Sequence, residues 1–586
     1  MTWYAYLFEA KSIQAWLTET GRLRDLVGGS ELLDDLTSGP LETALESLGL
    51  EIGDPDNVQQ DGKIYFSRRA GGAFYAFSQN REGMDQFAAL WPTVVIHRLP
   101  GLNFRTARAE HPESAYEAYL AARRNMSGAD PSPVMDLPLG SPLAERTQRT
   151  GRPAVDSIKK HGRREPVDAA TQIKHEAAEQ DSLSSLIRRF AGSDSEASDW
   201  PILLEPERKS DDARVLPFTR RPKDPAKRDN REEWKNRDQH RIAVIHADGN
   251  GFGQLLMKAG EAVRNNPDQF LKVFSSLSRA ISEATEQATQ RAVKKTLVEE
   301  RPPGSCMPAR PVVLGGDDLT VIVRADLAID FTRCFLAEFE KASEKQFSKL
   351  KKLIKGLNKG LTAAAGIVYL RANQPFGQAV ELAESVVKAV KQQTKAIDRD
   401  NPPSALAFYR VGGSLLDDYQ ALVAQELETE EGGIRYRQTL GSYAIHADQP
   451  GLPALEKLLD LQALFEHGHM AKGPARELMT LLTLDRSQAM VRYARWHRIL
   501  ADRQQDGIDL LKPLKDSLEP LLGQQSIRPD ELPFSEADEQ GICHAPFGDL
   551  MALTAMENQL DDKRRKKIDS AILSQASQDQ TSREAS

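Results

Sequence analysis

The sequence predicts an α+β fold with two copies of a βαββαβ unit, a helical region between them and a helical bundle after them. Residues 241–410 alternate apolar strand patterns with amphipathic helices in that order, and residues 1–110 repeat the order in a degraded form. Residues 111–240 are rich in helix, Pro, Ser and charge, and residues 411–560 show apolar residues at helical spacing. Residues 561–586 are expected to form a disordered tail.

An acidic hairpin is the centre of the second copy. Two β-branched runs within residues 312–323 flank Gly315, Gly316, Asp317 and Asp318, so a tight turn holds two carboxylates at its tip. Adjacent carboxylates repel each other, and a divalent cation such as Mg²⁺ or Mn²⁺ relieves that repulsion. A surface turn without a metal is the alternative interpretation.

A second acidic position lies upstream of the hairpin. The apolar run 242–247 ends in Asp248, and a glycine-rich stretch then leads into a helical pattern. Backbone N–H groups in such a stretch can hold a triphosphate, so we expect nucleotide contacts there, at Gly249, Asn250, Gly251 and Gly253, together with Gly315 and Gly316.

The remaining elements complete the second copy. Helical patterns cover about 268–295, 327–352 and 377–391, and a strand pattern covers 361–369. The resulting order βαββαβα is that of a ferredoxin-like palm, which places Asp248 and the hairpin tip on neighbouring central strands.

The first copy lacks the acidic pair. A strand over residues 3–10 ends at Ala10, and the segments 63–69 and 73–78 form a hairpin around Gly71 and Gly72. Matching this glycine pair to Gly315 and Gly316 places Ala73 and Phe74 where the second copy has its two aspartates. We therefore expect a degenerate palm without a metal.

The phrase Gly28-Gly29-Ser30 in the first copy has two interpretations. Ser30 is a suitable N-cap for a helix that starts beside it. Alternatively, Gly28, Gly29 and Ser30 line a nucleotide pocket between the two palms.

Three ordered motifs carry a family resemblance. They are Asp248-Gly-Asn-Gly-Phe-Gly, Gly315-Gly-Asp-Asp318, and Leu361-Thr-Ala-Ala-Ala-Gly-Ile-Val-Tyr followed by Ala383-Glu-Ser-Val-Val-Lys-Ala-Val-Lys391. They resemble the palm of the GGDEF and nucleotidyl-cyclase superfamily, and within it the large palm-domain subunit of type III CRISPR effector complexes, the cyclic-oligoadenylate synthetase.

The resemblance implies an enzyme that joins ATP into cyclic oligoadenylate by two-metal-ion catalysis. Asp248, Asp317 and Asp318 would be the catalytic metal ligands, and Lys391 would hold a phosphate. The implied partners are other CRISPR effector subunits, guide RNA and target RNA. Two alternatives remain open: a standalone GGDEF-like cyclase, and a non-catalytic scaffold subunit.

Two features of the family are missing from the sequence. It contains no His-Asp dipeptide, so we expect no HD nuclease activity. Its three cysteines, Cys306, Cys334 and Cys543, are too few and too far apart for a zinc-binding cluster or a disulfide framework.

Composition limits the remaining possibilities. The 586 residues carry a formal charge of −8, so any contact with RNA must be local. Neither a secretory leader nor a run of 18 apolar residues is evident, and we therefore expect a cytoplasmic protein that does not contact membranes.

Overall fold

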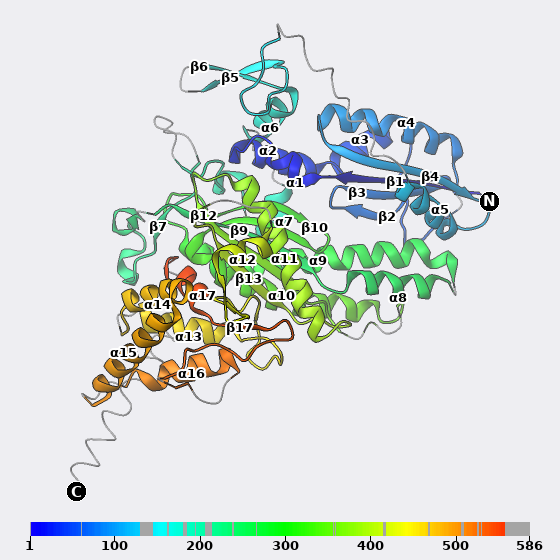
Figure 1. The fold of residues 1–586 in the computed structure, drawn as a ribbon. Helices are drawn as coiled ribbons and strands as arrows, with labels where there is room; N and C mark the ends of the chain where they lie inside the picture. Colours follow the sequence, from blue (N-terminus) through cyan, green and yellow to red (C-terminus); the bar gives the residue numbers. More distant parts are fainter. Residues whose placement is uncertain are drawn as a thin grey trace. The chain divides into compact units, whose positions relative to one another are not determined.

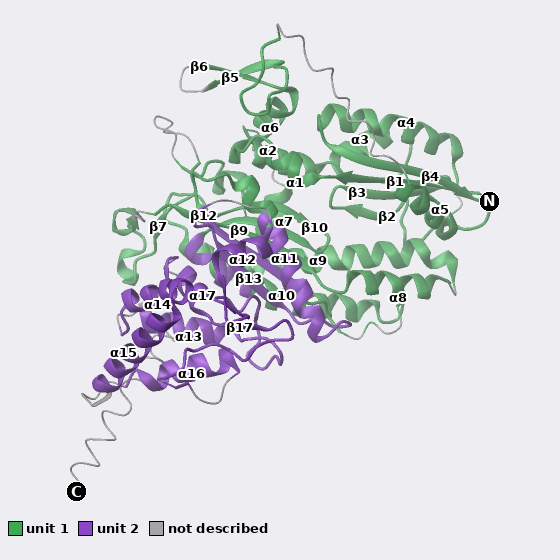
Figure 2. Ribbon diagram, viewed as in Figure 1, with its two compact units in different colours: residues 1–324, 334–363, 371–381 green, residues 325–333, 364–370, 382–586 purple. Residues whose placement is uncertain are grey.

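The computed structural model divides the chain into two compact units, which are described separately (Figure 2). Unit 1 comprises residues 1–324, 334–363 and 371–381, and unit 2 comprises residues 325–333, 364–370 and 382–586. The structure describes residues 2–556 except 60, 129–143, 161–162, 180–184, 194, 206–213, 237–238, 265, 355–356, 358, 414–417, 467–468, 506–508, 524–526 and 529. The expected tail therefore lies outside the described residues, and the bounds of the five expected regions stay predictions.

The first sheet of unit 1 has four antiparallel strands in the order β2-β3-β1-β4 (Figure 1). Its elements follow the predicted order βαββαβ, with three short helices in the first connection and one long helix in the second. They are β1 (Trp3–Lys11), α1 (Ile13–Thr18), α2 (Leu23–Asp35), α3 (Gly39–Ser47), β2 (Tyr65–Ala70), β3 (Ala73–Ser78), α4 (Arg81–Arg98) and β4 (Asn103–His111).

Both faces of this sheet are buried. On one face, Phe8 and Phe74 stack at 5.3 Å between ring centroids and pack against Trp91 of α4. The other face joins an apolar cluster with α5 (Ala115–Gly128), α8 (Phe252–Arg264) and α9 (Phe270–Thr296), in which Phe77 and Phe270 meet edge to face. Helices that follow the sequence motif of the second palm therefore complete the core of the first.

The second palm has strands in both units. In unit 1, β9 (Arg241–Gly249), β10 (Ala309–Gly315) and β11 (Asp318–Arg324) are antiparallel in the order β10-β11-β9. In unit 2, the order is β12-β13-β16, and β13 is parallel to β12. The other elements of the second palm, not all of which lie within one unit, are α10 (Ala328–Leu350), β12 (Ala363–Arg371), α11 (Phe376–Ile397), β13 (Ala405–Arg410) and β16 (Tyr443–Ala444). The predicted α+β class is confirmed.

The pairing register corrects the match between the two hairpins. Gly71 and Gly72 form the two-residue turn between Ala70 and Ala73, whereas Gly316 and Asp317 form the turn between Gly315 and Asp318. The two motifs are therefore offset by one residue, so that Gly72 takes the place of Asp317, and Ala73 that of Asp318.

The strand beside each hairpin shows the same offset. Glu9 pairs with Ala73, and extending the pair Leu319–Ala247 by one residue places Asp248 opposite Asp318. The counterpart of Asp248 is therefore Glu9 rather than Ala10.

The region between the palms contains more strand than expected. Two antiparallel pairs, β5 with β6 and β7 with β8, accompany its helices. Their bounds are β5 (Asp156–Lys160), β6 (Arg163–Val167), α6 (Ala169–Glu179), α7 (Ser185–Ala191), β7 (Thr219–Arg220) and β8 (Lys235–Asn236).

The region after residue 411, expected to be almost wholly helical, also contains a small sheet. Strands β14, β15 and β17 form a sheet in that order, and the turn between β14 and β15 places both Gly432 and Gly433 at positive φ. The elements are α12 (Tyr419–Glu426), β14 (Glu428–Glu431), β15 (Ile434–Arg437), α13 (Leu455–Glu466), α14 (Lys472–Leu484), α15 (Arg486–Gln505), α16 (Leu511–Leu522), β17 (Ile542–His544) and α17 (Phe547–Thr554). Among the described helices, none has the length and apolarity needed to cross a membrane.

Candidate active site

Three carboxylates converge in unit 1. Asp248 lies near the end of β9, Asp317 in the β10–β11 turn and Asp318 at the start of β11. One ligand atom from each side chain lies within 4.8 Å of the others, and all three residues are partly exposed. Carboxylate oxygens at this spacing and accessible to solvent suit a hard divalent cation such as Mg²⁺.

Glycines allow the carboxylates to approach one another. A Cβ atom on Gly249 would stand 2.9 Å from the Cβ of Asp317 and 3.0 Å from its Oδ2, closer than ordinary packing permits. Gly316 has φ +62° at the first position of the turn, which glycine adopts without strain. Both glycines therefore determine where Asp317 lies.

Neighbouring side chains anchor the turn and the strands beneath it. The Thr285 hydroxyl of α9 donates to the Gly316 carbonyl at 2.7 Å. One pleat below the acids, Nδ1 of His246 lies 2.9 Å from Oγ1 of Thr320, and both side chains are buried. The acidic turn is thus held from α9 as well as by its own strands.

The β9–α8 loop carries an unpaired acceptor two residues after Asp248. The Asn250 backbone N–H donates to the Thr362 carbonyl at 2.8 Å, and its Nδ2 donates to Oγ1 of Thr362 at 3.2 Å. Its Oδ1 is buried without a hydrogen-bond partner. Gly251 follows at φ +79°, and Gly253 lies in the first turn of α8. An orphaned acceptor at a helix entrance is a group that a bound ligand can satisfy.

The first palm keeps one carboxylate at the corresponding position but surrounds it with donors. Lys11 and the Tyr75 hydroxyl each contact Glu9 at 2.5 Å, and Arg123 contacts it at 2.9 Å. Although burial opposes ionisation, these hydrogen bonds and charges hold the pKa of Glu9 below its usual value. Glu9 is therefore already paired, and neither Gly72 nor Ala73 adds a second ligand.

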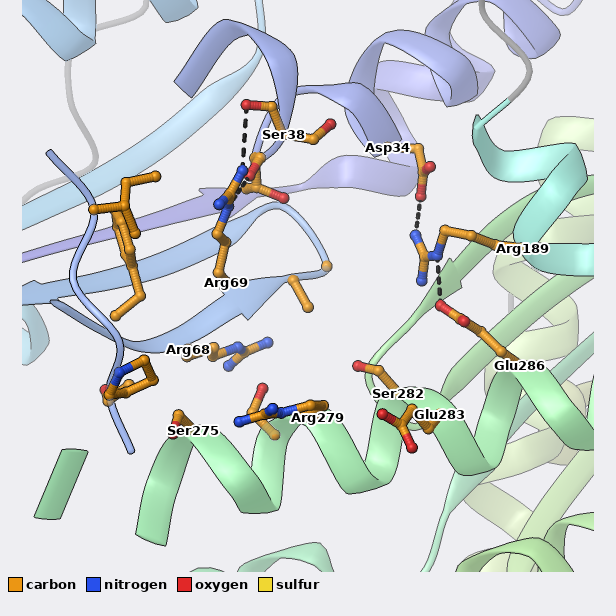
Figure 3. A pocket seen from close by; sticks show the side chains of 18 of the residues that line it. Asp34, Ser38, Arg68, Arg69, Arg189, Ser275, Arg279, Ser282, Glu283 and Glu286 are labelled. Atoms are coloured by element: carbon orange, nitrogen blue, oxygen red, sulfur yellow. Dashed lines mark hydrogen bonds and ion pairs between the residues drawn. The ribbon is translucent and has the colours of Figure 1, made fainter. Parts of the chain in front are cut away.

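A cavity of about 670 Å³ lies beside the first hairpin (Figure 3). Its lining includes Gly71, the basic side chains of Arg68 and Arg279, and residues of α2, α7 and α9, among them the acidic Asp34, Glu283 and Glu286. Two hydroxyls in the lining, on Ser67 and Ser282, are buried without a partner. Cationic groups together with unpaired hydroxyls suit a ligand that carries both phosphate and hydrogen-bonding groups.

Comparison with protein families identifies the region that carries the acids. Residues 241–400 match the model of the Cas10/Cmr2 second palm domain. This part of the chain belongs to the Cas10/Cmr2 palm family. The resemblance inferred from the motifs is confirmed for this region.

Solved structures of Csm1 are similar to the chain at low identity. A Csm1–Csm4 cassette in complex with cA4 matches at 13% identity and a TM-score of 0.34, covering 67% of this chain and 53% of that chain. The chain thus spans about half the length of that relative. A Csm1–Csm4 cassette in complex with cA3 and Csm1 in T. onnurineus match at 13% identity with TM-scores of 0.44 and 0.42, each covering 95% of this chain and 70% of the other. The comparison with curated proteins gave no match.

The phrase Gly28-Gly29-Ser30 lies in the middle of α2, so the N-cap interpretation was wrong. The Ser30 hydroxyl donates to the Leu26 carbonyl at 2.7 Å, and its side chain is buried. A Cβ atom on Gly28 would overlap the Lys174 carbonyl of α6, at 1.7 Å. The glycines thus permit close packing of α2 on α6, and a nucleotide contact at this phrase stays a prediction.

Lys391 lies on α11 within unit 2, whereas the acidic cluster belongs to unit 1. Its phosphate-binding role stays a prediction. Sequence reasoning missed the basic cavity residues Arg68 and Arg279, because arginines on a strand and on a long helix give no local signal of a shared cavity.

Proposed function

We propose that this protein is a nucleotidyltransferase that makes cyclic oligoadenylate from ATP, as the large subunit of a type III CRISPR effector complex. The main support is the convergence of Asp248, Asp317 and Asp318 within a Cas10/Cmr2-type palm. ATP is proposed as the nucleotide because the motifs resemble those of the cyclic-oligoadenylate synthetase.

The three aspartates fit the Mg²⁺ or Mn²⁺ that the family resemblance implies. Their ligand atoms lie within 4.8 Å of one another, and the acceptor of Asn250, two residues after Asp248, lacks a partner. When bound there, the metal would lower the pKa of a ribose hydroxyl and neutralise the leaving pyrophosphate. The chain itself holds the carboxylates in place through Gly249, Gly316 and Thr285.

The donor nucleotide would be held by the second palm. The loop of Gly249, Asn250 and Gly251 leads directly into α8, and the first backbone N–H groups of a helix, which lack partners within it, bind phosphate oxygens.

The acceptor nucleotide would be held by the first palm. The cavity beside Gly71 offers Arg68 and Arg279 for phosphate, and Ser67 and Ser282 as hydrogen-bonding groups. Because Glu9 is neutralised by Lys11 and Arg123, this side can bind a nucleotide without recruiting its own metal. In this scheme, the second palm activates the reacting groups, and the first palm positions the acceptor nucleotide.

Joining two nucleotides in this way depends on the relative position of the palms, since an error of about 1 Å can cost about a hundredfold in rate. We infer that binding of guide and target RNA, together with other effector subunits, sets this position. The isolated chain should therefore bind ATP and turn it over slowly.

Incubation of the purified chain with ATP and Mg²⁺, with and without guide RNA, target RNA and partner subunits, tests this function. Mass spectrometry should detect cyclic oligoadenylate, with a higher yield in the assembled complex. The matched control is the double variant Asp317→Asn, Asp318→Asn. Absence of any ATP-derived oligonucleotide under all conditions would refute the proposal, as would a product yield that the double variant retains. Rapid synthesis of cyclic dinucleotide from GTP by the chain alone would instead identify a standalone cyclase.

A further inference from the structure

Helix α2 of the first palm carries two buried carboxylates, one paired with an arginine of β10 and the other with an arginine of α7. Glu31 and Asp34 lie one helical turn apart, and their side chains are 3% and 9% exposed. Arg310 of β10 donates to Glu31 at 2.8 Å. Asp34 contacts the guanidinium of Arg189, which belongs to α7. Two charge pairs thus connect α2 to β10 and to α7.

Arg189 uses its guanidinium in three directions. Nη1 donates to Asp34, Nε donates to Glu286 of α9 at 2.6 Å, and Nη2 donates to the Leu314 carbonyl at 2.9 Å (Figure 3 shows the two carboxylate contacts). Leu314 directly precedes Gly315. One side chain therefore connects α2, α9 and the last residues of β10.

The contact with Leu314 satisfies a backbone group at a sheet edge. Within the described strands of unit 1, β10 is the outer strand of the order β10-β11-β9. Carbonyls on the free side of an edge strand need a donor from elsewhere. Arg189 supplies that donor three residues before Asp317.

A direct role in ligand binding is the competing explanation, because Arg189 also lines the cavity. Its charge, however, is already matched by two carboxylates, and the Ser185 hydroxyl fixes one of them by donating to Asp34 at 2.7 Å. One guanidinium between two carboxylates leaves a net negative group, which disfavours phosphate. The contacts therefore favour a structural role for Arg189 over a role in phosphate binding.

We propose that Arg189 is a positioning residue for the nucleotidyl-transfer site, holding the end of β10 against α2 and α9 so that Asp317 and Asp318 meet Asp248. The role of Arg189 rests on the proposed function only in the kinetic test, which measures nucleotidyl transfer. A lysine cannot replace the arginine, because an ammonium on a flexible stem does not reproduce three donors in a fixed plane.

Two variants separate positioning from ligand binding. Arg189→Lys and Asp34→Asn should each lower kcat about tenfold to a hundredfold, with the KM for ATP changed less than about twofold. Their combination should lower kcat no further than the stronger single variant, because both disrupt one contact set. If Arg189 bound phosphate instead, Arg189→Lys would raise the KM, and Asp34→Asn would lower it by freeing the guanidinium. Arg188→Lys, at the exposed neighbouring position, is the matched control.

Hydrogen exchange provides a measurement that does not need ATP turnover. Amides of residues 309–324 should exchange faster in both variants than in the wild type, whereas those of β4 should be unchanged. Mn²⁺ binding, followed by electron paramagnetic resonance, should weaken by at least about threefold. Unchanged exchange and Mn²⁺ affinity in Asp34→Asn would overturn the proposal, as would an effect confined to the KM. If the wild type makes no product from ATP, the proposed function fails, and these two measurements still decide whether Arg189 positions the turn.

Discussion

The Cα atom of Gly71 lies 2.9 Å from the point at which a Cβ atom on Gly315 would stand, so the degenerate and the acidic hairpins meet backbone to backbone. Gly71 itself adopts φ +63°, which favours glycine. The contact links the turn beside the cavity to the turn that carries Asp317. A change in the separation of the two hairpins would therefore alter both sides of the proposed reaction.

Gly315→Ala should separate the two turns. The added methyl group meets backbone rather than a flexible side chain, so the hairpins must shift to accept it. We expect ATP turnover to fall at least about tenfold, and the melting temperature to fall by several degrees. Gly473→Ala on α14, where a Cβ meets nothing within 4 Å, is the control and should leave both unchanged. Wild-type turnover in Gly315→Ala would show that the hairpin contact has no role in activity.

Metal binding should stabilise the wild type through the acidic cluster. Because a ligand that binds the folded state raises its stability, Mg²⁺ should raise the melting temperature of the wild type. The double variant Asp317→Asn, Asp318→Asn should lose this response. In EDTA it should melt at or above the wild-type temperature, since neutral side chains relieve the repulsion among three carboxylates. A clear destabilisation of the double variant in EDTA would show instead that the aspartates support the fold.

The acidic site could be predicted from the sequence because its signals are local. A two-residue glycine-containing turn between apolar strands specifies the hairpin, and the strand that ends at Asp248 is a continuous apolar run. The structure adds that these segments come together within one unit.

The pairing register of the strands could not be predicted from the sequence, because spacing along the chain does not specify which residues face each other. The sequence match therefore chose Ala10, whereas the register selects Glu9 as the counterpart of Asp248. The small sheet after residue 411 was missed for a similar reason, since β15 pairs with β17 more than 100 positions away. The Gly432-Gly433 turn was the available local signal for its hairpin.

Contacts that depend on tertiary structure were also missed. Arg189 and Glu31 look like ordinary helical charges in the sequence, and their partners lie far along the chain. Serine is a preferred N-cap residue, but α2 begins at Leu23, so that Ser30 lies inside the helix and is buried.

The buried pair Glu31 and Arg310 should make stability depend on pH. Burial raises the pKa of Glu31 to about 7, although the Arg310 charge opposes this. Because the folded pKa exceeds the unfolded value, the folded state binds more protons between about pH 4.5 and 7, and this contribution to stability is lost as the pH rises.

Glu31→Gln removes that titration. The melting temperature of the variant relative to the wild type should rise between about pH 4.5 and 7 and then level off. Thermal unfolding across this range checks it, with Glu42→Gln at the protein surface as the control. A difference in melting temperature that is constant with pH would show that Glu31 stays ionised in the folded protein.

The cavity beside Gly71 can be tested by filling it. Ser282→Trp introduces a large side chain from α9 into the space beside Arg68 and Arg279. We expect the affinity for the acceptor ATP to fall at least about tenfold, because the ring occupies the volume that the nucleotide needs. Lys294→Trp, at an exposed position of the same helix, should have no effect. Ser30→Trp should unfold the protein rather than block the cavity, because Ser30 is buried within α2.

Calorimetric titration with a non-hydrolysable ATP analogue separates the two nucleotide positions. Wild-type protein should bind two analogues in the presence of Mg²⁺, and Ser282→Trp should bind one, with its melting temperature within about 2 °C of the wild type. The remaining analogue should still require the aspartates, since in the proposed site they would hold the metal that binds its phosphates. If Ser282→Trp binds two analogues as tightly as the wild type, the acceptor lies elsewhere, and the cavity beside Gly71 has another ligand.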